Sequence, residues 1–146
     1  MTHTTRTLAQ TAQVAATLAQ EIVADKHPRL VLLQGDLGGG KTTFCQAFGK
    51  ALGIEQDITS PTFVIMKSYP IPGDQHTLHH LDLYRIEKAW ELEELGLPAI
   101  IQDPTAILLV EWPNKTPEFW TDLPHTLVDF QVIDETSRKI TIHYKS

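Results

Sequence analysis

The spacing of apolar residues along the chain predicts an alternation of helices and strands. In residues 7–24 apolar side chains recur every three or four positions, which indicates an amphipathic helix packed on a sheet. Core packing is the favoured role of this helix, and contact with a nucleotide base is the alternative. The apolar runs at 29–34 and within 105–113 are instead short and unbroken, as in strands buried on both faces. The same criteria predict a helix over 43–52, a β-hairpin formed by 63–69 and 76–84, an acidic helix over 87–95, and antiparallel strands over 126–133 and 139–144.

Glycine and proline mark the ends of the predicted helices. Gly53 is placed to cap the helix over 43–52, and Gly96 with Pro98 should stop the helix over 87–95. The last two strands should pair at the end of the sheet.

One stretch between the first strand and the second helix carries recognisable chemistry. Residues Gly35-Asp36-Leu37-Gly38-Gly39-Gly40-Lys41-Thr42 match the phosphate-loop pattern G-x-x-x-x-G-K-[ST] without a mismatch. Glycines let consecutive backbone N–H groups turn toward phosphate oxygens, because no Cβ stands in the way. The residues expected to bind a nucleotide are Gly38, Gly39, Gly40, Lys41, Thr42 and Thr43.

Lys41 and Thr42 have distinct predicted roles. Lys41 should reach the β- and γ-phosphates, projecting toward phosphate or solvent and not into the core, while Thr42 should place its hydroxyl on Mg²⁺. A buried strand before the loop and a helix after it supply the context that the motif requires. The predicted fold is therefore α/β: a P-loop NTPase-like single domain over residues 1–146, with a mixed, mostly parallel sheet, flanking helices and antiparallel C-terminal strands.

Two acidic residues at strand ends are candidates for a metal shell. Asp82 is flanked by leucines, and a carboxylate in so apolar a strand needs a partner such as Mg²⁺. Glu111 ends the apolar run within 105–113, as the acid of a Walker B strand does beside a phosphate loop. The pattern leaves open which acid binds Mg²⁺ and which orients water. Trp112 follows directly, and either core packing or a wall of the site fits it.

The segment Ser60–Phe63 displays hydroxyl groups shortly after the phosphate-loop helix. Pro61 holds Ser60 away from helical dihedrals, so the segment should be extended. Either it closes over the γ-phosphate and Mg²⁺, as in many NTPases, or it is a plain Ser-Pro loop.

Histidine and cysteine suggest alternatives that the pattern disfavours. His76, His79 and His80 invite a transition-metal site, but His79 and His80 are neighbours on a strand and should point to opposite faces. Cys45 lies inside a predicted helix, where a packed side chain is a better interpretation than a nucleophile.

Composition narrows the range of partners. The chain of 146 residues has 12 Lys and Arg against 18 Asp and Glu, a net charge of −6 at pH 7. Nucleic-acid binders usually present a basic face, so tight direct binding to RNA or DNA is not expected. The chain has no apolar run of membrane-spanning length, and residues 1–6 lack a signal-peptide pattern. We expect a cytoplasmic protein without a membrane partner, monomeric or weakly oligomeric alone.

Five motifs occur in a fixed order along nearly the whole chain. After the phosphate loop with Thr43-Phe44 they are Ser60-Pro61-Thr62-Phe63, His80-Leu81-Asp82-Leu83-Tyr84-Arg85, Glu91-Leu92-Glu93-Glu94-Leu95-Gly96 and Val110-Glu111-Trp112-Pro113. Together they resemble the TsaE (YjeE) family, the bacterial ATPase needed to make threonylcarbamoyladenosine (t6A) in tRNA next to the anticodon.

This resemblance implies a role for each matching position. Lys41 and the surrounding loop would bind ATP, with ADP as the product, and Thr42 and Glu111 would hold Mg²⁺. Asp82 would be an acid needed for hydrolysis, so Lys41, Asp82 and Glu111 are the candidate catalytic residues. The Ser60–Phe63 segment would be the switch-like loop.

The resemblance also implies partners. Family members act with the TsaB and TsaD proteins: TsaD transfers the threonylcarbamoyl group to adenosine, and ATP hydrolysis by the TsaE-type subunit would reset that complex. The chain would thus reach tRNA only through its partners. Two departures from the family pattern occur, because Gly39 stands where alanine is usual and Asn114-Lys115 stands where an acidic or amide residue is commoner.

Other functions share parts of this pattern. A small-molecule P-loop kinase has the same strand, loop and helix, but commonly needs a lid with several arginines, and past the loop only Arg85 and Arg138 occur. A GTPase would carry Asn-Lys-x-Asp, and Asn114-Lys115-Thr116-Pro117 has the wrong fourth residue. A nucleotide-binding scaffold that never hydrolyses would not need the metal-shell residues.

Overall fold

The computed structural model describes residues 1–35, 40–59 and 65–146, so the predicted roles of Gly38, Gly39 and the Ser60–Phe63 segment lie outside the described residues. The strands are β1 (Thr2–Thr5), β2 (Leu30–Gly35), β3 (Met66–Pro70), β4 (Thr77–Asp82), β5 (Ala106–Glu111), β6 (His125–Val132) and β7 (Arg138–Lys145). The helices are α1 (Leu8–Val23), α2 (Lys41–Ala51), α3 (Trp90–Glu94), α4 (Leu97–Gln102) and α5 (Pro117–Trp120), with a 3₁₀ turn η1 (Pro113–Lys115).

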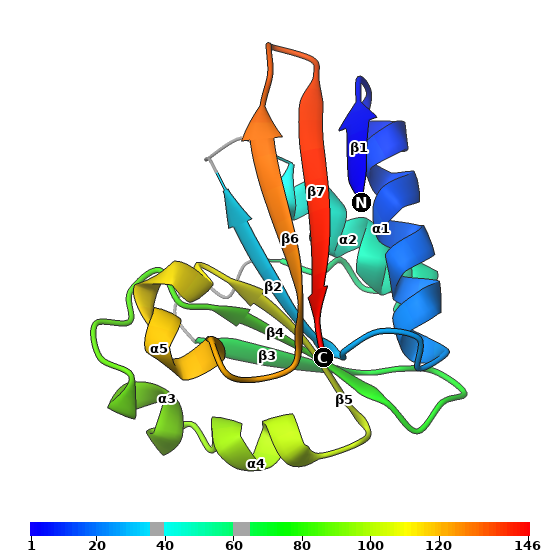
Figure 1. Ribbon diagram of the computed structural model, residues 1–146. Coiled ribbons are helices and arrows are strands. Elements are labelled where there is room, and N and C mark those ends of the chain that lie inside the picture. The colour runs from blue at the N-terminus through cyan, green and yellow to red at the C-terminus, as the bar shows by residue number, and fades with distance from the viewer. Residues whose placement is uncertain (36–39, 60–64) are drawn as a thin grey trace.

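These strands form one mixed sheet in the order β1-β7-β6-β2-β5-β4-β3 (Figure 1). The central strands β6, β2, β5 and β4 are parallel, while β7 and β3 pair antiparallel outside them. This arrangement confirms the predicted fold class. It corrects one detail, because the pair β6–β7 does not end the sheet: β1 adds beyond β7 as an antiparallel edge strand.

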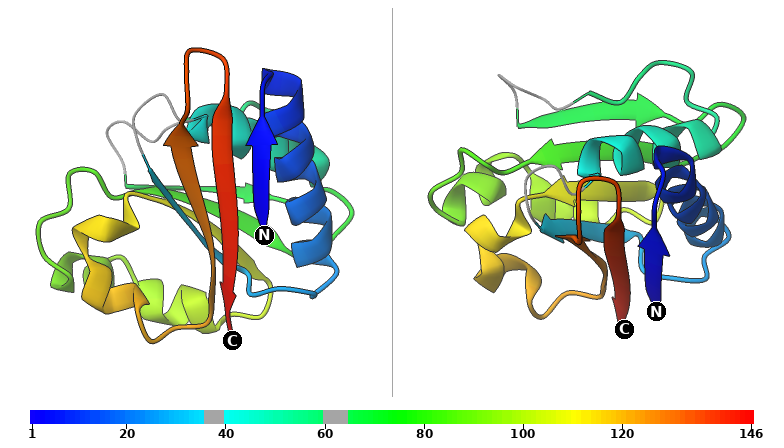
Figure 2. Two further views of the ribbon diagram at one scale, coloured as in Figure 1. Left: turned by 45° about the horizontal axis from the view of Figure 1, so that its top comes forward. Right: turned by 90° about the horizontal axis from the view of Figure 1, so that it is seen from above.

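Helices cover both faces of the sheet (Figure 2). On one face α1 and α2 pack through Leu18, Ile22, Phe44 and Phe48, against Val31 and Leu33 among others. On the other face α3, α4 and α5 pack through Leu92, Leu97 and Trp120, against Leu30 and Leu32 among others. Consecutive residues of β2 therefore enter opposite cores, which is why its sequence is an unbroken apolar run.

The structure contains short elements that the sequence pattern did not predict, among them β1, α4 and α5. β1 has four residues and the polar sequence THTT. Gly96, with φ of +77°, ends α3 as expected, but the prediction that Pro98 stops helical structure is wrong. Pro98 lies in the first turn of α4, where a missing N–H leaves no helical hydrogen bond unmade, and Pro117 begins α5 in the same way.

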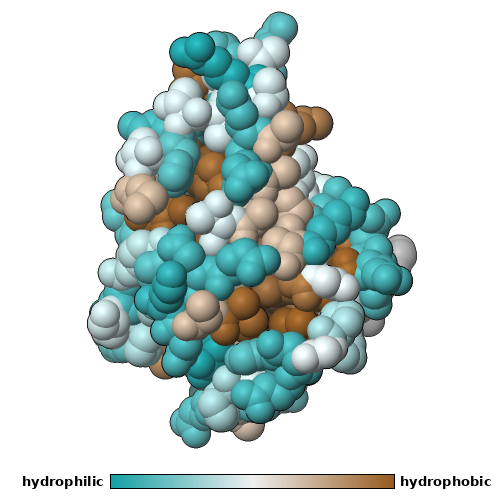
Figure 3. Space-filling model, turned by 90° about the vertical axis from the view of Figure 1, so that its right-hand side faces the viewer, coloured by the Kyte–Doolittle hydropathy of each residue, from teal (hydrophilic) through white to brown (hydrophobic). Residues whose placement is uncertain are grey.

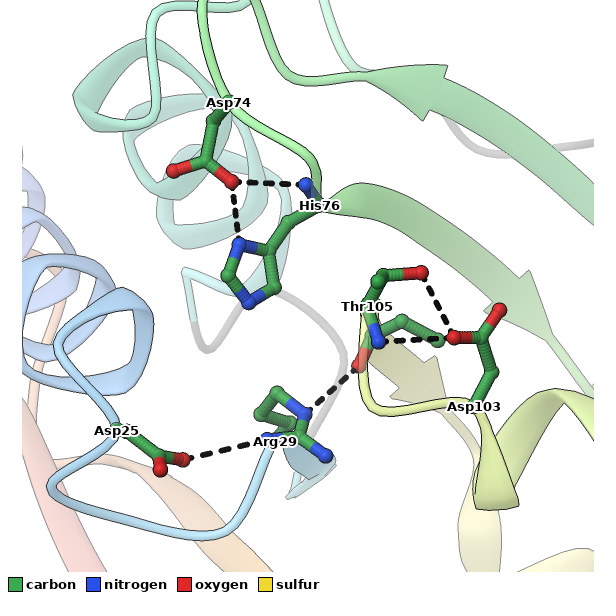
Figure 4. A network of polar contacts seen from close by, with 7 residues as sticks. Asp25, Arg29, Asp74, His76, Asp103 and Thr105 are labelled. Carbon is green, nitrogen blue, oxygen red and sulfur yellow. Dashed lines mark hydrogen bonds and ion pairs between the residues drawn. The ribbon is translucent and has the colours of Figure 1, made fainter.

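Polar contacts tie the edge where the parallel strands begin (Figure 4). Arg29 donates from Nη1 to Asp25 Oδ1 at 3.2 Å and from Nε to the Ala106 carbonyl at 3.2 Å. His76 donates its backbone N–H to Asp74 Oδ1 at 2.8 Å, and its ring contacts the same carboxylate. His76 is thus engaged in the turn before β4, and the three histidines do not form the metal cluster considered above.

The face of the molecule on the α1 side of Figure 1 carries both hydrophilic and hydrophobic residues. Figure 3 shows hydrophilic residues around its rim and hydrophobic residues gathered toward its middle. Within residues 1–35, 40–59 and 65–146, no helix has both the length and the apolar character that crossing a membrane requires.

Candidate functional site

The carboxyl ends of β2, β4 and β5 meet at one edge of the sheet. Asp82 pairs in register with Glu111, and Glu111 pairs with Leu33 near the end of β2. Paired residues of parallel strands point to the same face, and this face is the one that α1 and α2 cover. The structure therefore brings together the two acids that the sequence separates.

The start of α2 lies at the same edge. Gly40 precedes the helix with φ of +98°, a left-handed conformation that glycine adopts without strain. Within the part of the chain that the structure describes, no side chain caps the first turn of α2. The N–H groups and the positive end of the dipole at a helix start favour an anion.

A pocket of about 710 Å³ opens between these elements. The sequence-predicted residues that line it are Gly40, Lys41, Thr42, Thr43, Asp82 and Glu111. Its volume is typical of a site for a small molecule of nucleotide size. The described members of the predicted nucleotide and metal sets therefore share one cavity.

Lys41 is held inside this pocket and does not project into solvent. Its side chain donates from Nζ to the Gly35 carbonyl at 3.1 Å, and Nζ lies 4.1 Å from the centroid of the Trp112 ring. The residue is only 7% exposed. Of the two expected directions, solvent or phosphate, the side chain takes the one into the pocket, where the aromatic face and the carbonyl stabilise the cation.

Trp112 combines the two alternatives left open by the sequence, because it lines the pocket and also packs against the core on the side of α3, α4 and α5. Its backbone has φ of +60°, an unusual conformation for a bulky residue and a source of strain. The turn places its ring over Lys41 and at 5.1 Å from the ring of Tyr84, edge to face. No local sequence pattern indicates this backbone conformation.

The two acids differ in their surroundings. Glu111 is buried, and its Oε2 lies 2.7 Å from Nε2 of the buried His80. Asp82 is half-buried, and its Oδ1 accepts from the Tyr84 backbone N–H at 3.0 Å. Sequence reasoning considered His80 only as a metal ligand and missed its contact with Glu111, which the spacing of β4 and β5 along the chain does not reveal.

Cys45 lies on α2 beneath the site. Its Sγ, a ring nitrogen of His80 and a carboxylate oxygen of Glu111 all lie within 4.8 Å of one another. Burial, reinforced by the negative charge of Glu111, raises the pKa of the Cys45 thiol well above its ordinary value. A protonated, fully packed thiol confirms the prediction of a structural side chain.

The far walls of the pocket come from segments distant in the sequence. The segment from β1 to α1 contributes Arg6, Thr7, Leu8 and Thr11, and the β6–β7 hairpin contributes Glu135, Thr136 and Arg138. Thr5 pairs with Arg138 in the β1–β7 register, and a 2.9 Å hydrogen bond joins the hydroxyls of Thr5 and Thr11. Of this wall, sequence reasoning had noted Arg138 and, as an alternative to core packing, contact of the helix over 7–24 with a nucleotide base. Arg85 is exposed and is not among the described residues lining the pocket.

The donor set of the pocket suits a hard divalent cation. Thr42 offers a hydroxyl, and Asp82 and Glu111 offer carboxylates, all from the same cavity. Oxygen ligands of this kind are those that Mg²⁺ prefers, usually together with phosphate oxygens.

Fold and pocket together define an α/β protein with an anion-accepting helix start and two acids at the carboxyl edge of its parallel strands. A sequence profile of the family described as "Threonylcarbamoyl adenosine biosynthesis protein TsaE" matches residues 5–140. The chain belongs to the TsaE family.

Individual relatives agree with this assignment. The Streptomyces coelicolor tRNA threonylcarbamoyladenosine biosynthesis protein TsaE is 38% identical over 117 residues, which cover 77% of this chain and 78% of the relative. The Rickettsia prowazekii protein of the same name is 34% identical over 142 residues, 97% of this chain and 93% of the relative. The crystal structure of Bacillus subtilis YdiB is similar with a TM-score of 0.70 and 30% identity, covering 97% of this chain and 83% of that one.

Proposed function

We propose that this chain binds and hydrolyses ATP with Mg²⁺, and that it does so in the formation of t6A in tRNA together with TsaB and TsaD. The observation that carries the proposal is the convergence of the α2 start with Asp82 and Glu111 in one pocket. Membership of the TsaE family supports the pathway.

Each residue has a role in this proposal. The N–H groups at Gly40 to Thr43 receive the phosphates, together with Gly38 and Gly39, and Lys41 balances charge on the β- and γ-phosphates. Thr42 and Glu111 hold Mg²⁺, which would neutralise charge on the phosphate oxygens when bound. Asp82, on the neighbouring strand end, orients the attacking water.

The Lys41 contacts indicate how binding begins. A phosphate entering the pocket offers Nζ a full negative charge in place of the Gly35 carbonyl and the Trp112 face. Lys41 therefore exchanges weaker partners for a stronger one when the nucleotide arrives. The walls formed by residues 6–11 and 135–138 would take the nucleoside.

Partners should control the rate. The pocket contains the cations Arg6, Lys41 and Arg138 among its described lining residues, and Arg6 is exposed. Phosphoryl transfer depends on fixed positive charge around the transferring group, so hydrolysis by the chain alone should be slow. Assembly with TsaB and TsaD would order the switch-like Ser60–Phe63 segment, and an acidic chain would reach tRNA through those partners.

Steady-state ATP turnover tests the proposal. It should be measured for the chain alone, with TsaB and TsaD, and with tRNA added. We expect a slow basal rate that rises with the partners. A rate of zero under all conditions would favour a nucleotide-binding scaffold, and phosphate transfer to a small molecule would favour a kinase.

Variants test the two acids within the same assay. Asp82→Ala and Glu111→Ala should each reduce turnover by about a hundredfold or more while ATP still binds, since water or metal loses a positioned anion. Asp122→Ala, at an exposed acid outside the pocket lining, is the control and should keep the parent rate. Unchanged turnover in both pocket variants would remove these acids from the site.

A gel shift with tRNA at physiological salt tests the dependence on partners. The chain alone should give no tight complex, because its net charge of −6 opposes binding to the phosphate backbone. A tight, salt-sensitive complex without TsaB and TsaD would overturn this part of the proposal.

A further inference from the structure

A buried histidine lies directly behind the acid that ends β5. His80 and Asp82 are two residues apart on β4 and share the face toward α2, while His79 points to the other face, with Nδ1 2.8 Å from Ser68 Oγ. His80 Nε2 lies 2.7 Å from Glu111 Oε2, and the two residues are 1% and 8% exposed.

This contact restricts the Glu111 carboxylate. A carboxylate that binds a cation only accepts hydrogen bonds, so in that state the Nε2–H of His80 would be the donor. The distance of 2.7 Å is that of a strong, charge-assisted bond. It holds Oε2 against β4, and the other oxygen, Oε1, remains for a ligand in the pocket that Glu111 lines.

The second ring nitrogen shows that packing alone does not account for this histidine. His80 Nδ1 is buried and has no hydrogen-bond partner among the described residues. A buried polar atom without a partner lowers stability. An apolar side chain such as leucine would fill the same space without that penalty, so the contact with Glu111 is the feature that requires histidine.

A transition-metal site formed by Cys45, His80 and Glu111 is the competing interpretation, because their ligand atoms lie within 4.8 Å of one another. The short His80–Glu111 hydrogen bond already engages one ligand atom of each of these two residues, so a metal would have to displace it. Cys45 is buried within α2, where a packed thiol fits without a metal.

We propose that His80 is a positioning residue, whose Nε2–H fixes one oxygen of Glu111 so that the other can bind the divalent cation in the pocket. This inference rests on the proposed function of the site. His80 itself touches neither nucleotide nor metal, and acts only through Glu111.

Three substitutions separate this role from a structural one. His80→Gln keeps a side-chain N–H donor near the position of Nε2, His80→Asn is one bond shorter and does not reach, and His80→Leu removes the donor. His79→Leu, on the same strand but the opposite face, is the matched control. The readouts are Mn²⁺ affinity of the ADP complex by electron paramagnetic resonance, ADP affinity in EDTA by calorimetry, and Tm.

We expect His80→Leu and His80→Asn to weaken Mn²⁺ binding by roughly tenfold to a hundredfold, the usual effect of losing a residue that orients a metal ligand. His80→Gln should recover most of the affinity, and His79→Leu should keep it. ADP affinity in EDTA should stay within about twofold of the parent in every variant, because no phosphate contact changes. The Tm values of His80→Leu and His80→Asn should fall by similar amounts, because both leave the buried Glu111 Oε2 without its donor.

Wild-type Mn²⁺ affinity in both His80→Leu and His80→Asn would overturn the inference. Equal losses of Mn²⁺ affinity and metal-free ADP affinity would do the same, because they indicate general damage to the site. If His80→Leu does not fold, the Mn²⁺ affinities of His80→Asn and His80→Gln test the inference instead. Both side chains are polar, and only glutamine reaches the position of Nε2. If the parent chain binds neither ADP nor Mn²⁺, the proposed function itself fails.

Discussion

Lys41 makes contacts that bear directly on what its removal should do. Its Nζ lies beside the Gly35 carbonyl and over the Trp112 ring, in a pocket that also holds the start of α2. Lys41→Ala deletes the charge that faces the phosphates while leaving the sheet and helix packing in place. We expect ADP affinity by calorimetry to fall by about a hundredfold or more, with the circular dichroism spectrum unchanged.

Lys50→Ala is the matched control for that substitution. Lys50 lies in the last turn of the same helix and is exposed, far from the pocket lining. It should retain parental affinity. Equal ADP binding by Lys41→Ala and the parent would show that the α2 start is not the phosphate site.

Cys45 should respond to pH through its burial. The folded thiol has a pKa above the ordinary value of 9.0, so in the unfolded chain the thiol loses its proton first. Stability from this group is therefore present below that ordinary value and declines as the pH rises above it. At pH 8 we expect the native thiol to react with a disulfide reagent at least about a hundredfold more slowly than the unfolded chain. Equal rates would contradict its burial.

At the scale of elements, β2 ends against β6 at a point where a side chain does not fit. Gly35 has φ of +134°, and a Cβ there would lie 2.2 Å from the Phe130 carbonyl oxygen. Gly35→Ala should therefore destabilise the fold by about 2–4 kcal/mol, measured by urea unfolding. Gly73→Ala, also at positive φ but with open space around it, should lose only about 1 kcal/mol. Equal losses would indicate backbone strain alone.

Periodicity predicted those elements that bury a regular face. The two-faced run of β2 and the helical spacing of α1 and α2 both exclude other structures, so their existence and order were predictable. β1 is short and polar, and it becomes a strand only because β7 offers it an unpaired edge. The helices α4 and α5 carry prolines in their first turns, and from sequence alone a proline also fits the end of a helix.

In the candidate site too, some features could be predicted from the sequence and others depend on contacts between separate elements. The motif predicted Lys41, Thr42 and the two acids, because these roles depend on residue type and order along the chain. The left-handed turn at Trp112 and the hydrogen bond from His80 depend on how separate strands come together. Residue spacing within one segment of the sequence does not predict either feature.

For the whole molecule, nucleotide binding should appear as thermal stabilisation. ADP with Mg²⁺ at about a hundred times its Kd should add about 2.7 kcal/mol to the free energy of unfolding. For a chain of 146 residues this corresponds to a rise in Tm on the order of 5–10 °C by calorimetry. The rise should be smaller in EDTA, because the proposed bonds of Thr42 and Glu111 to the metal cannot form.

Lys41→Ala provides the control for this shift, and it should show little change in Tm at the same ADP concentration. A full shift in that variant would mean that ADP binds elsewhere on the molecule.

The pairing of β1 with β7 has a consequence for how the protein folds. Thr5 faces Arg138 across these strands, so segments far apart in the sequence must meet before they can line the pocket together. Contacts of such long sequence separation form slowly, because a long loop must close first. The pocket should therefore acquire its full lining late in refolding, after the contacts between α1 and α2 have formed.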